Sequence, residues 1–296
     1  MDHPVTDPLG TPWMVRMPCC QLALLWHLTS TTPVLTARWR PVGGSSMDLE
    51  DATDTFEELV TTLERSRRGA VVLSGAGISV SSDIPAFRGS DGLWARYDPM
   101  EYATIDALEA DPEKVWQMLW ELDAVLEAAE PNAAHLAIAE LQHLGVVSTV
   151  ITQNVDALHQ EAGSEDVVEL HGSRRTLSCL TCRHTVTRDE VVHEATRGAV
   201  PGCQVCGGQL RPDVVFFGEL LPQAALHRAF DAVQGCDDLI VAGTAAEVEP
   251  AASLPRMAEQ AGARVWEINP APCLATDRRI LRPAEQALPA LVERLR

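Results

Sequence analysis

The first regular pattern of apolar and polar positions lies in the segment DLEDATDTFEELVTTLERSRRG. Its apolar residues fall on one face of a helix: Phe56, Leu59, Val60 and Leu63. Acidic residues lead the segment, arginines end it and Gly69 follows, an order that favours helix start and stop at these places. The pattern predicts a surface helix that begins near residue 47.

Short apolar runs then alternate with helical stretches. Runs typical of strands cover 70–73, 146–151, 167–170, 213–217, 238–242 and 264–268. Helical spacing covers 132–144, 222–234, 250–261 and 284–295, and another helix opens at DPEKVWQMLWEL with Asp111 as N-cap. Strands that alternate with helices predict an α/β fold with a doubly wound parallel, Rossmann-like sheet, which binds ligands at the carboxyl ends of its strands.

The first 46 residues lack this regularity and are rich in Pro, Thr and Trp. A signal peptide begins with basic residues, whereas Asp2 and Asp7 precede the short LALLWHL run here. We therefore expect residues 1–46 to be a disordered extension, or to lie ahead of the true start at Met47, and we do not expect secretion.

Composition and charge narrow the class of partner. The chain has 296 residues, 46% of them hydrophobic, and no apolar run approaches the roughly 20 residues of a membrane span. With 23 basic and 42 acidic residues, the net charge of −19 argues against a protein that binds nucleic-acid phosphates. We expect a cytoplasmic protein with no nucleic-acid and no membrane partner, and leave its oligomeric state open.

Two cysteine pairs carry the strongest single signal. Cys179-x-x-Cys182 and Cys203-x-x-Cys206 are separated by 20 residues, the arrangement of a four-cysteine zinc site. Because four thiolates fill the coordination sphere, the zinc is expected to be structural. We predict a zinc-ribbon insert over 173–211, between the parts 47–172 and 212–296 of one nucleotide-binding domain.

The loop SGAGISVSSDIPAFRG follows the run 70–73 and looks like a phosphate-binding loop. Gly75 and Gly77 supply the G-x-G of a dinucleotide fingerprint, but Val80 stands in place of the third glycine. The loop also continues into Phe87 and Arg88, side chains that a plain cofactor cradle does not need. It is therefore expected to do more than hold a phosphate.

Polar residues follow the other strand runs. Gln153, Asn154 and Asp156 come after the run 146–151, where turn formation is an alternative explanation for such residues. His171 ends the run 167–170 and is a candidate general base. Gly243 with Thr244, and Asn269 with Pro270, end two further runs and suit phosphate or ribose contacts.

Together these motifs resemble the sirtuin family of NAD-dependent protein-lysine deacylases. GAGISVSSDIPAFRG, TQNVDALH, ELHGS, the cysteine pairs, LRPDVVFFGE, GTAAEVEP and EIN occur in the family's order, and the resemblance covers about residues 48–296. It implies NAD as co-substrate, one structural zinc ion, and acyl-lysine proteins or peptides as partners. It also implies release of nicotinamide and transfer of the acyl group, most simply acetyl, to ADP-ribose.

The resemblance also implies a role for each matching residue. His171 would be the general base, assisted by Asn154 and Asp156, and Phe87 would shield the reacting ribose carbon. NAD would contact Gly75, Ala76, Gly77, Ser79, Asp83, Phe87, Arg88, Trp94, Gln153, Asn154, Val155, Asp156, Gly243, Thr244, Ala245, Asn269, Pro270, Ala271 and Ala284. The peptide would add as a strand beside VVFFGE, at Val215, Phe217, Gly218 and Glu219.

The sequence departs from the family pattern at some of these positions. Asp83 replaces a usual glycine, and Ala245 replaces a usual serine. Family members that prefer succinyl or malonyl groups carry a Tyr and an Arg where this chain has Leu119 and Leu122. Those leucines predict a neutral acyl substrate, although they could instead be ordinary core residues.

Three other functions remain open from the sequence. An NAD-dependent oxidoreductase would need the missing third glycine. A non-catalytic zinc- or NAD-binding interaction module has no need of Asn154, Asp156 and His171. A protein mono-ADP-ribosyltransferase on the same fold is compatible with every motif.

Overall fold

The structure is a computed structural model that describes residues 48–85, 96–194 and 198–296. The first 47 residues and three expected NAD contacts, Phe87, Arg88 and Trp94, lie outside the described residues.

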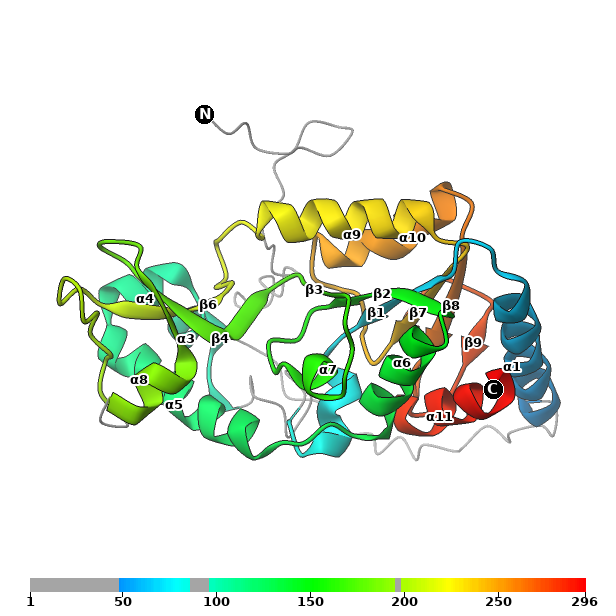
Figure 1. Cartoon of the computed structure of the whole chain (residues 1–296), viewed down its shortest axis with the longest axis horizontal. Helices are drawn as coiled ribbons and strands as arrows, with labels where there is room; N and C mark the ends of the chain where they lie inside the picture. Colours follow the sequence, from blue (N-terminus) through cyan, green and yellow to red (C-terminus); the bar gives the residue numbers. More distant parts are fainter. Residues whose placement is uncertain (1–47, 86–95, 195–197) are drawn as a thin grey trace, which may run out of the picture.

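Six parallel strands form the main sheet, in the order β3-β2-β1-β7-β8-β9 (Figure 1). The strands are β1 (Ala70–Ser74), β2 (Val147–Thr152), β3 (Val167–Glu169), β7 (Asp238–Ala242), β8 (Arg264–Ile268) and β9 (Arg279–Ile280). Every residue of β1 and β7 is buried, as expected for central strands covered on both faces. The chain reverses its winding direction between β1 and β7, so this order confirms the doubly wound sheet and places its crevice there.

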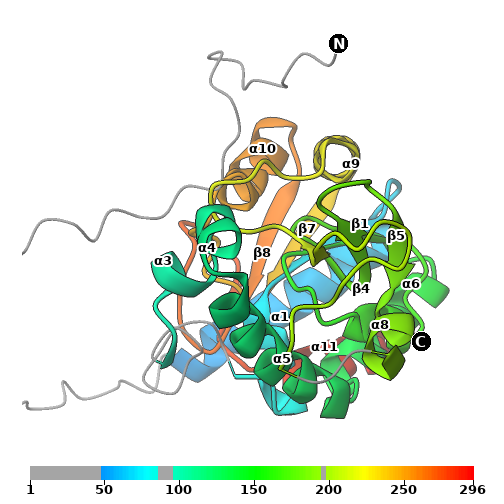
Figure 2. The same cartoon turned by 90° about the vertical axis from the view of Figure 1, so that its left-hand side faces the viewer.

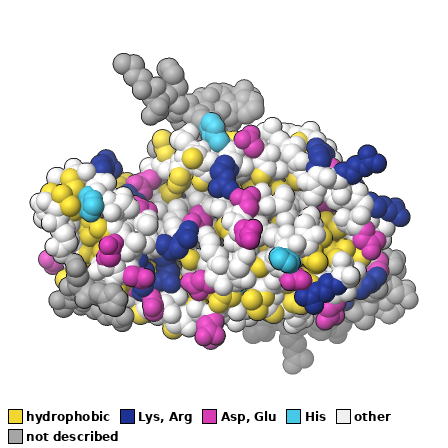
Figure 3. All heavy atoms as spheres, viewed as in Figure 1, with side chains coloured by type: hydrophobic (Ala, Val, Ile, Leu, Met, Phe, Trp, Pro, Cys, Tyr) yellow, Lys and Arg dark blue, Asp and Glu magenta, His cyan; other side chains and the backbone are white. Residues whose placement is uncertain are grey.

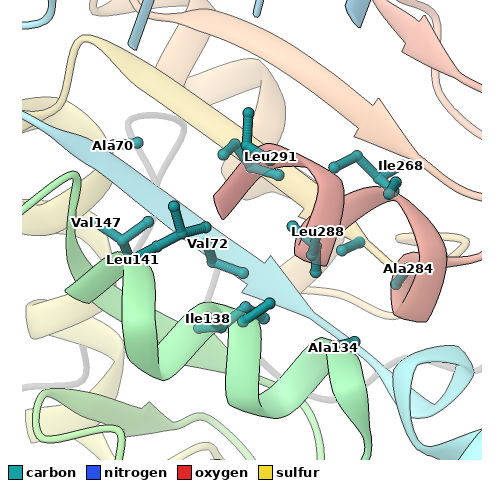
Figure 4. Close-up of a cluster of buried hydrophobic side chains, with 14 of the residues drawn as sticks. Ala70, Val72, Ala134, Ile138, Leu141, Val147, Ile268, Ala284, Leu288 and Leu291 are labelled. Atoms are coloured by element: carbon teal, nitrogen blue, oxygen red, sulfur yellow. The ribbon is translucent and has the colours of Figure 1, made fainter. Parts of the chain in front are cut away.

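Helices cover both faces of this sheet (Figures 1 and 2). On one face lie α1 (Asp48–Arg65), α6 (Ala133–His143) and α11 (Ala284–Leu295), and on the other α9 (Gln223–Gly235), η2 (Ala251–Ser253) and α10 (Leu254–Gln260). Figure 4 shows Val72 of β1 between Ile138 and Leu141 of α6 and Leu288 and Leu291 of α11. Truncating one such leucine to alanine costs about 2–5 kcal/mol, so this layered core fixes the strand ends in place.

A smaller antiparallel sheet has the order β5-β4-β6. Its strands are β4 (Gly172–Cys179), β5 (Thr185–Thr187) and β6 (Leu210–Val214). The expected main-sheet strand at 213–217 was wrong, because the strand ends at Val214 and pairs with β4. An apolar run shows that a segment is buried but not which strand it pairs with.

The remaining helices surround this smaller sheet and the crevice. They are α3 (Pro99–Tyr102), α4 (Ile105–Ala110), α5 (Pro112–Ala128), α7 (Leu158–Glu161) and α8 (Arg188–Glu194). As predicted, Asp111 caps α5, and its carboxylate accepts a hydrogen bond from the Lys114 N–H at 3.1 Å. Trp116 and Trp120 of α5 share one apolar cluster with Leu177 of β4, so α5 forms a wall of the smaller sheet's core.

On the face shown in Figure 3, the basic side chains do not gather into a single patch, in agreement with the acidic composition of the chain. On that face, acidic side chains lie among the Lys and Arg side chains (Figure 3). No helix in the described part of the chain is long and apolar enough to cross a membrane.

Candidate active site

Two glycine-containing loops interlock at the carboxyl ends of β1 and β7. The Gly77 N–H donates to the Gly243 carbonyl at 2.8 Å. A Cβ atom at Gly77 would lie 2.7 Å from that oxygen, and one at Gly243 would lie 2.3 Å from the Ile78 nitrogen. Only glycine fits either position, and the contact leaves the Gly77 backbone exposed at the crevice. This is the kind of surface that can receive a pyrophosphate.

The loop after β1 continues as a 3₁₀ helix, η1 (Ala76–Ser82), which ends at Asp83. Asp83 has a left-handed backbone (φ 61°, ψ 17°), the conformation that glycine adopts most readily. Asp83 is exposed, whereas Ile78 and Ser79 are buried. The replacement of the family's glycine therefore leaves the carboxylate at the surface.

Buried polar side chains connect η1 to the segment after β2. The Asn154 side-chain amide donates to Ser79 Oγ at 3.1 Å, and the Ser79 hydroxyl donates to Asp156 Oδ2 at 2.7 Å. The second Asp156 oxygen accepts the Leu158 N–H at 3.0 Å. Asn154 Oδ1 is buried and has no partner among the described residues. These bonds orient the amide oxygen as a free acceptor at the crevice.

A histidine that the sequence analysis missed extends this network. The Asn132 N–H donates to His135 Nδ1 at 3.3 Å, which places the proton of the neutral ring on Nε2. His135 Nε2 lies 3.4 Å from Ser79 Oγ and can donate to it. Burial lowers the pKa of His135 to about 4, and that of the neighbouring His159 to about 3. Both rings are therefore neutral near pH 7 and act as fixed hydrogen-bond groups.

His171 lies where β3 gives way to β4. Its Nδ1 is 2.9 Å from the Gln153 carbonyl oxygen, which can only accept, so Nδ1 carries the proton. Nε2 is buried and has no partner among the described residues, and burial lowers the pKa of the ring below its usual value. The geometry leaves an unprotonated Nε2 lone pair that is ready to accept a proton.

The predicted ribose and adenosine residues follow β2, β7 and β8. The Gln153 side-chain amide donates to Thr244 Oγ1 at 2.8 Å. The Asn269 amide donates to the Thr244 carbonyl at 3.2 Å and to Glu267 Oε1 at 3.0 Å, which leaves Asn269 Oδ1 as an acceptor. Ala245, Pro270 and Ala271 are exposed beside them, and Ala284 is buried at the start of α11.

The expected peptide strand is already partly paired. The Phe217 N–H donates to the Ala103 carbonyl at 2.8 Å, and the Phe217 carbonyl accepts the Ile105 N–H at 3.2 Å. The Val215 N–H donates to the His171 carbonyl at 2.8 Å. Gly218 is exposed next to them. A peptide that adds here therefore meets Gly218 more readily than the backbone of Phe217.

Glu219 does not present a free carboxylate to a substrate. Arg211 donates to both of its oxygens, at 2.5 and 2.8 Å, and the Phe216 N–H donates to it at 2.9 Å. The ion pair closes the turn after β6 and fixes the loop that contains Gly218.

Comparisons with known proteins match this arrangement. The model of the Sir2 family matches residues 75–250. NAD-dependent protein deacylase 2 of Archaeoglobus fulgidus is 44% identical over 82% of this chain and 97% of its own length. The chain belongs to the Sir2 family. NAD-dependent protein deacylase 2 of Pyrobaculum aerophilum is 48% identical over 80% of this chain and 95% of its own.

Solved structures agree with the assignment to the Sir2 family. A Sir2 homologue in complex with NAD is 43% identical, has a TM-score of 0.74, and covers 81% of this chain and 93% of its own. Sir2Tm bound to a propionylated peptide is 33% identical with a TM-score of 0.72, and covers 80% of this chain and 97% of its own.

The crevice of this Sir2 chain fits NAD on two observations. Side chains are excluded at Gly77 and Gly243, where a pyrophosphate needs close approach to the backbone. The buried acceptor Asn154 Oδ1 and the buried His171 Nε2 have no partner among the described residues, as expected for atoms that face a bound polar ligand.

The four predicted zinc ligands lie together beside the smaller sheet, at the end of β4 and in the loops that follow β4 and precede β6. All four sulfur atoms lie within 4.8 Å of one another, with Cys179 and Cys206 3.5 Å apart and Cys182 and Cys203 3.7 Å apart. A tetrahedron with Zn–S bonds of about 2.3 Å has S–S edges of about 3.8 Å. A Cβ atom at Gly208 would lie 3.1 Å from Cys179 Sγ. The site therefore fits a structural zinc ion held by Cys179, Cys182, Cys203 and Cys206.

Leu119 and Leu122 of α5 both line a cavity of about 80 Å³. Val155, which stands between Asn154 and Asp156, lines the same cavity, and so do Trp116 and Val214. Both leucines are partly buried. They therefore face an internal space beside the crevice.

Proposed function

We propose that this protein is an NAD-dependent protein-lysine deacylase that removes neutral acyl groups, acetyl above all, and releases nicotinamide. The observation that carries the proposal is the His171 ring, which has its proton fixed on Nδ1 and a buried Nε2 lone pair with no partner among the described residues. A general base needs this combination of an oriented ring and a free lone pair.

The residues around His171 bind and orient the reactants. Bound NAD supplies the ribose carbon that receives the acyl oxygen when nicotinamide leaves. Asn154 and Asp156 hold ribose and carboxamide groups, and their orientation comes from Ser79. The Gln153 carbonyl holds His171 so that Nε2 can take a proton from a ribose hydroxyl.

The adenosine half and the peptide occupy the two ends of the crevice. Thr244 and Asn269 bind the adenosine ribose, and Asn269 Oδ1 is left free for a hydroxyl donor. The peptide backbone pairs beside Gly218, in a loop held by Arg211 and Glu219. Acyl-lysine proteins or peptides are thus the partners.

The choice of a neutral acyl group rests on Leu119 and Leu122. Both line the cavity next to Val155, so an acyl chain that extends past the lysine meets their apolar side chains there. A carboxylate held against these two leucines would lose its hydration without gaining a partner from them, at a cost of several kcal/mol. The double variant Leu119→Tyr/Leu122→Arg is expected to gain activity on succinyl-lysine.

Domain organisation and location complete the proposal. The sequence suggests a nucleotide-binding domain of residues 47–172 and 212–296 and a zinc-ribbon insert of 173–211; since β4 begins at Gly172 and β6 ends at Val214, we extend the insert to 172–214. It is supported by α5 through Trp116 and Trp120. A cytoplasmic location is supported by the six cysteines that the structure describes, none of which forms a disulfide. The absence of nucleic-acid and membrane partners stays a prediction from charge and composition, and the oligomeric state stays open.

A panel of acyl-lysine peptides tests the proposal. Acetyl-, butyryl- and succinyl-lysine in one peptide are incubated with NAD, and nicotinamide and acyl-ADP-ribose are both measured. Equal amounts of the two products, with kcat/KM highest for a neutral acyl group, are expected. Nicotinamide release with ADP-ribose attached to the peptide, seen by mass spectrometry, would instead identify a mono-ADP-ribosyltransferase. A clear preference for succinyl-lysine would contradict the neutral acyl group.

A further inference from the structure

The cavity beside the crevice has charged residues as well as leucines on its wall. Arg174 of β4 and Arg188 of α8 line it opposite α5, and Asp123 of α5 lines it with them. The two guanidinium groups are nearly buried, with 13% and 11% of each side chain exposed. A cavity with two such cations would attract an acidic acyl group if the cations were free.

Both guanidinium groups donate hydrogen bonds to Asp123. Arg188 donates to its two carboxylate oxygens at 2.6 Å each, and Arg174 donates to one of them at 3.2 Å. Glu127, one helical turn further along α5, contacts Arg188 from outside the cavity and is 53% exposed. Asp189 also contacts Arg188, at 3.4 Å, so the two cations face three carboxylates, of which only Asp123 lines the cavity.

Three residues that line the cavity are close in the chain to the proposed catalytic residues or to their partners. Val155 separates Asn154 from Asp156, Arg174 lies three residues after His171, and Val214 precedes the residue whose N–H bonds to the His171 carbonyl. Its volume of about 80 Å³ is roughly half that of a cavity that holds benzene. An acyl chain only a few carbon atoms longer than acetyl would therefore fill the cavity.

We infer that Asp123 is a specificity-determining residue, which makes this cavity reject acidic acyl groups by neutralising Arg174 and Arg188. The inference rests on the proposed deacylase function and adds a second cause of its neutral preference, independent of Leu119 and Leu122. An acyl carboxylate that enters the cavity meets guanidinium groups that Asp123 already neutralises, and it lies close to the Asp123 carboxylate. Among the Arg174 donors, Nε has no partner in the described part of the chain.

Replacing Asp123 with asparagine removes one negative charge and keeps the shape of the side chain. Arg188 then keeps only the exposed carboxylates of Glu127 and Asp189, which do not line the cavity. An incoming carboxylate can take over the bidentate partner position on Arg188 that Asp123 had. The variant is therefore expected to accept succinyl-lysine.

The test compares two acyl groups of equal size that differ only in charge. A peptide with succinyl-lysine and the same peptide with its terminal amide analogue, succinamyl-lysine, are turned over with NAD by the wild type, Asp123→Asn and Glu127→Gln. The kcat/KM ratio of succinyl to succinamyl is expected to rise roughly 10- to 100-fold in Asp123→Asn, the range of a charged hydrogen bond. Glu127→Gln removes the same charge outside the cavity and is expected to keep the wild-type ratio.

The acetyl-lysine activity of each variant shows whether it has folded. If Asp123→Asn is insoluble, Asp123→Ser, which leaves room for water beside the guanidinium groups, repeats the comparison. An Asp123 variant that deacetylates but keeps the wild-type ratio overturns the inference, and so does an equal rise in Glu127→Gln. A wild type that turns over no acyl peptide defeats the proposed function itself.

Discussion

The two sheets of this protein are stabilised in different ways. The main sheet lies between two apolar clusters, supplied by α1, α6 and α11 on one face and by α9 and α10 on the other. The smaller sheet has three short strands, shares its apolar cluster with α4 and α5, and brings four cysteine thiols together. The main sheet can fold on apolar burial, whereas the smaller one depends on a metal ion and a wall from outside it.

The two regions also divide the work. The proposed catalytic residues His171, Asn154 and Asp156 follow strands of the main sheet, so the proposed chemistry would depend on how rigidly those strand ends are held. The residues that line the cavity of about 80 Å³ come mostly from α5, β4 and α8 around the smaller sheet. Changes at the strand ends of the main sheet should therefore affect catalysis. Changes around the smaller sheet should affect stability or substrate choice.

The largest effect is expected from removing a zinc ligand. Cys179→Ser or Cys203→Ser should lose zinc and become insoluble, because a structural zinc site supplies about 10–16 kcal/mol of apparent binding free energy to folding. Metal content by elemental analysis and solubility are the measurements. Cys273→Ser, an exposed thiol outside the cluster, is the control and should keep both. One zinc ion per chain in an active Cys179→Ser protein would disprove the four-cysteine site.

The next effect concerns chemistry alone. His171→Ala should lower kcat for acyl transfer by about 10²- to 10⁴-fold, because a positioned general base contributes that much. Its melting temperature and much of its NAD affinity, measured by calorimetry, should be retained. Near-normal turnover would remove His171 from the mechanism.

A third effect is a loss of stability at low pH, caused by two buried histidines beside the main sheet. Burial lowers the pKa of His135 to about 4 and of His159 to about 3, whereas both take up protons near pH 6.5 when unfolded. The unfolded chain then binds more protons, so stability is fully present above about pH 6.5 and is lost as the pH falls toward 4. Chemical denaturation between pH 5 and 8 should show this loss, by up to about 1.4 kcal/mol per pH unit for each ring.

Matched variants sharpen the pH experiment. His135→Asn should remove the part of the dependence that comes from that ring and leave the His159 part, and His143→Gln, an exposed histidine on the same helix, should leave the dependence unchanged. Since burial also lowers the pKa of His171, kcat/KM should hold at pH 6.5 and fall only in more acidic buffer. If kcat/KM already falls as the pH is lowered from 8 to 7, the base is not the neutral, buried ring of His171.

The smallest effect is expected at the N-terminus. Deleting residues 1–46 should leave activity and melting temperature almost unchanged, since that segment has no periodic apolar face to pack on either sheet. Thermal denaturation and an activity assay of the full-length and the shortened protein, run side by side, test this. A fall of several degrees would show that the segment docks on the folded protein.

Local sequence determined much of the main sheet. Its central strands are mostly apolar runs, and one of its helices, α6, carries a visible N-cap in Asn132. Strand ends can therefore be read from the chain, and with them the positions of Gly77, Asn154, His171 and Thr244. The cysteine spacing likewise determined the zinc ligands, because a tetrahedral site needs four thiolates at such intervals.

Only the tertiary structure decided which distant groups meet. It paired Leu210–Val214 with β4 instead of the main sheet, joined His135 to Ser79, and placed Arg174 and Arg188 against Asp123. Hydrogen bonds and ion pairs between residues 37 to 65 positions apart leave no periodic trace in the sequence, since each partner alone resembles an ordinary surface residue. Burial on folding removes the competing water and turns these scattered residues into a network and a cavity wall.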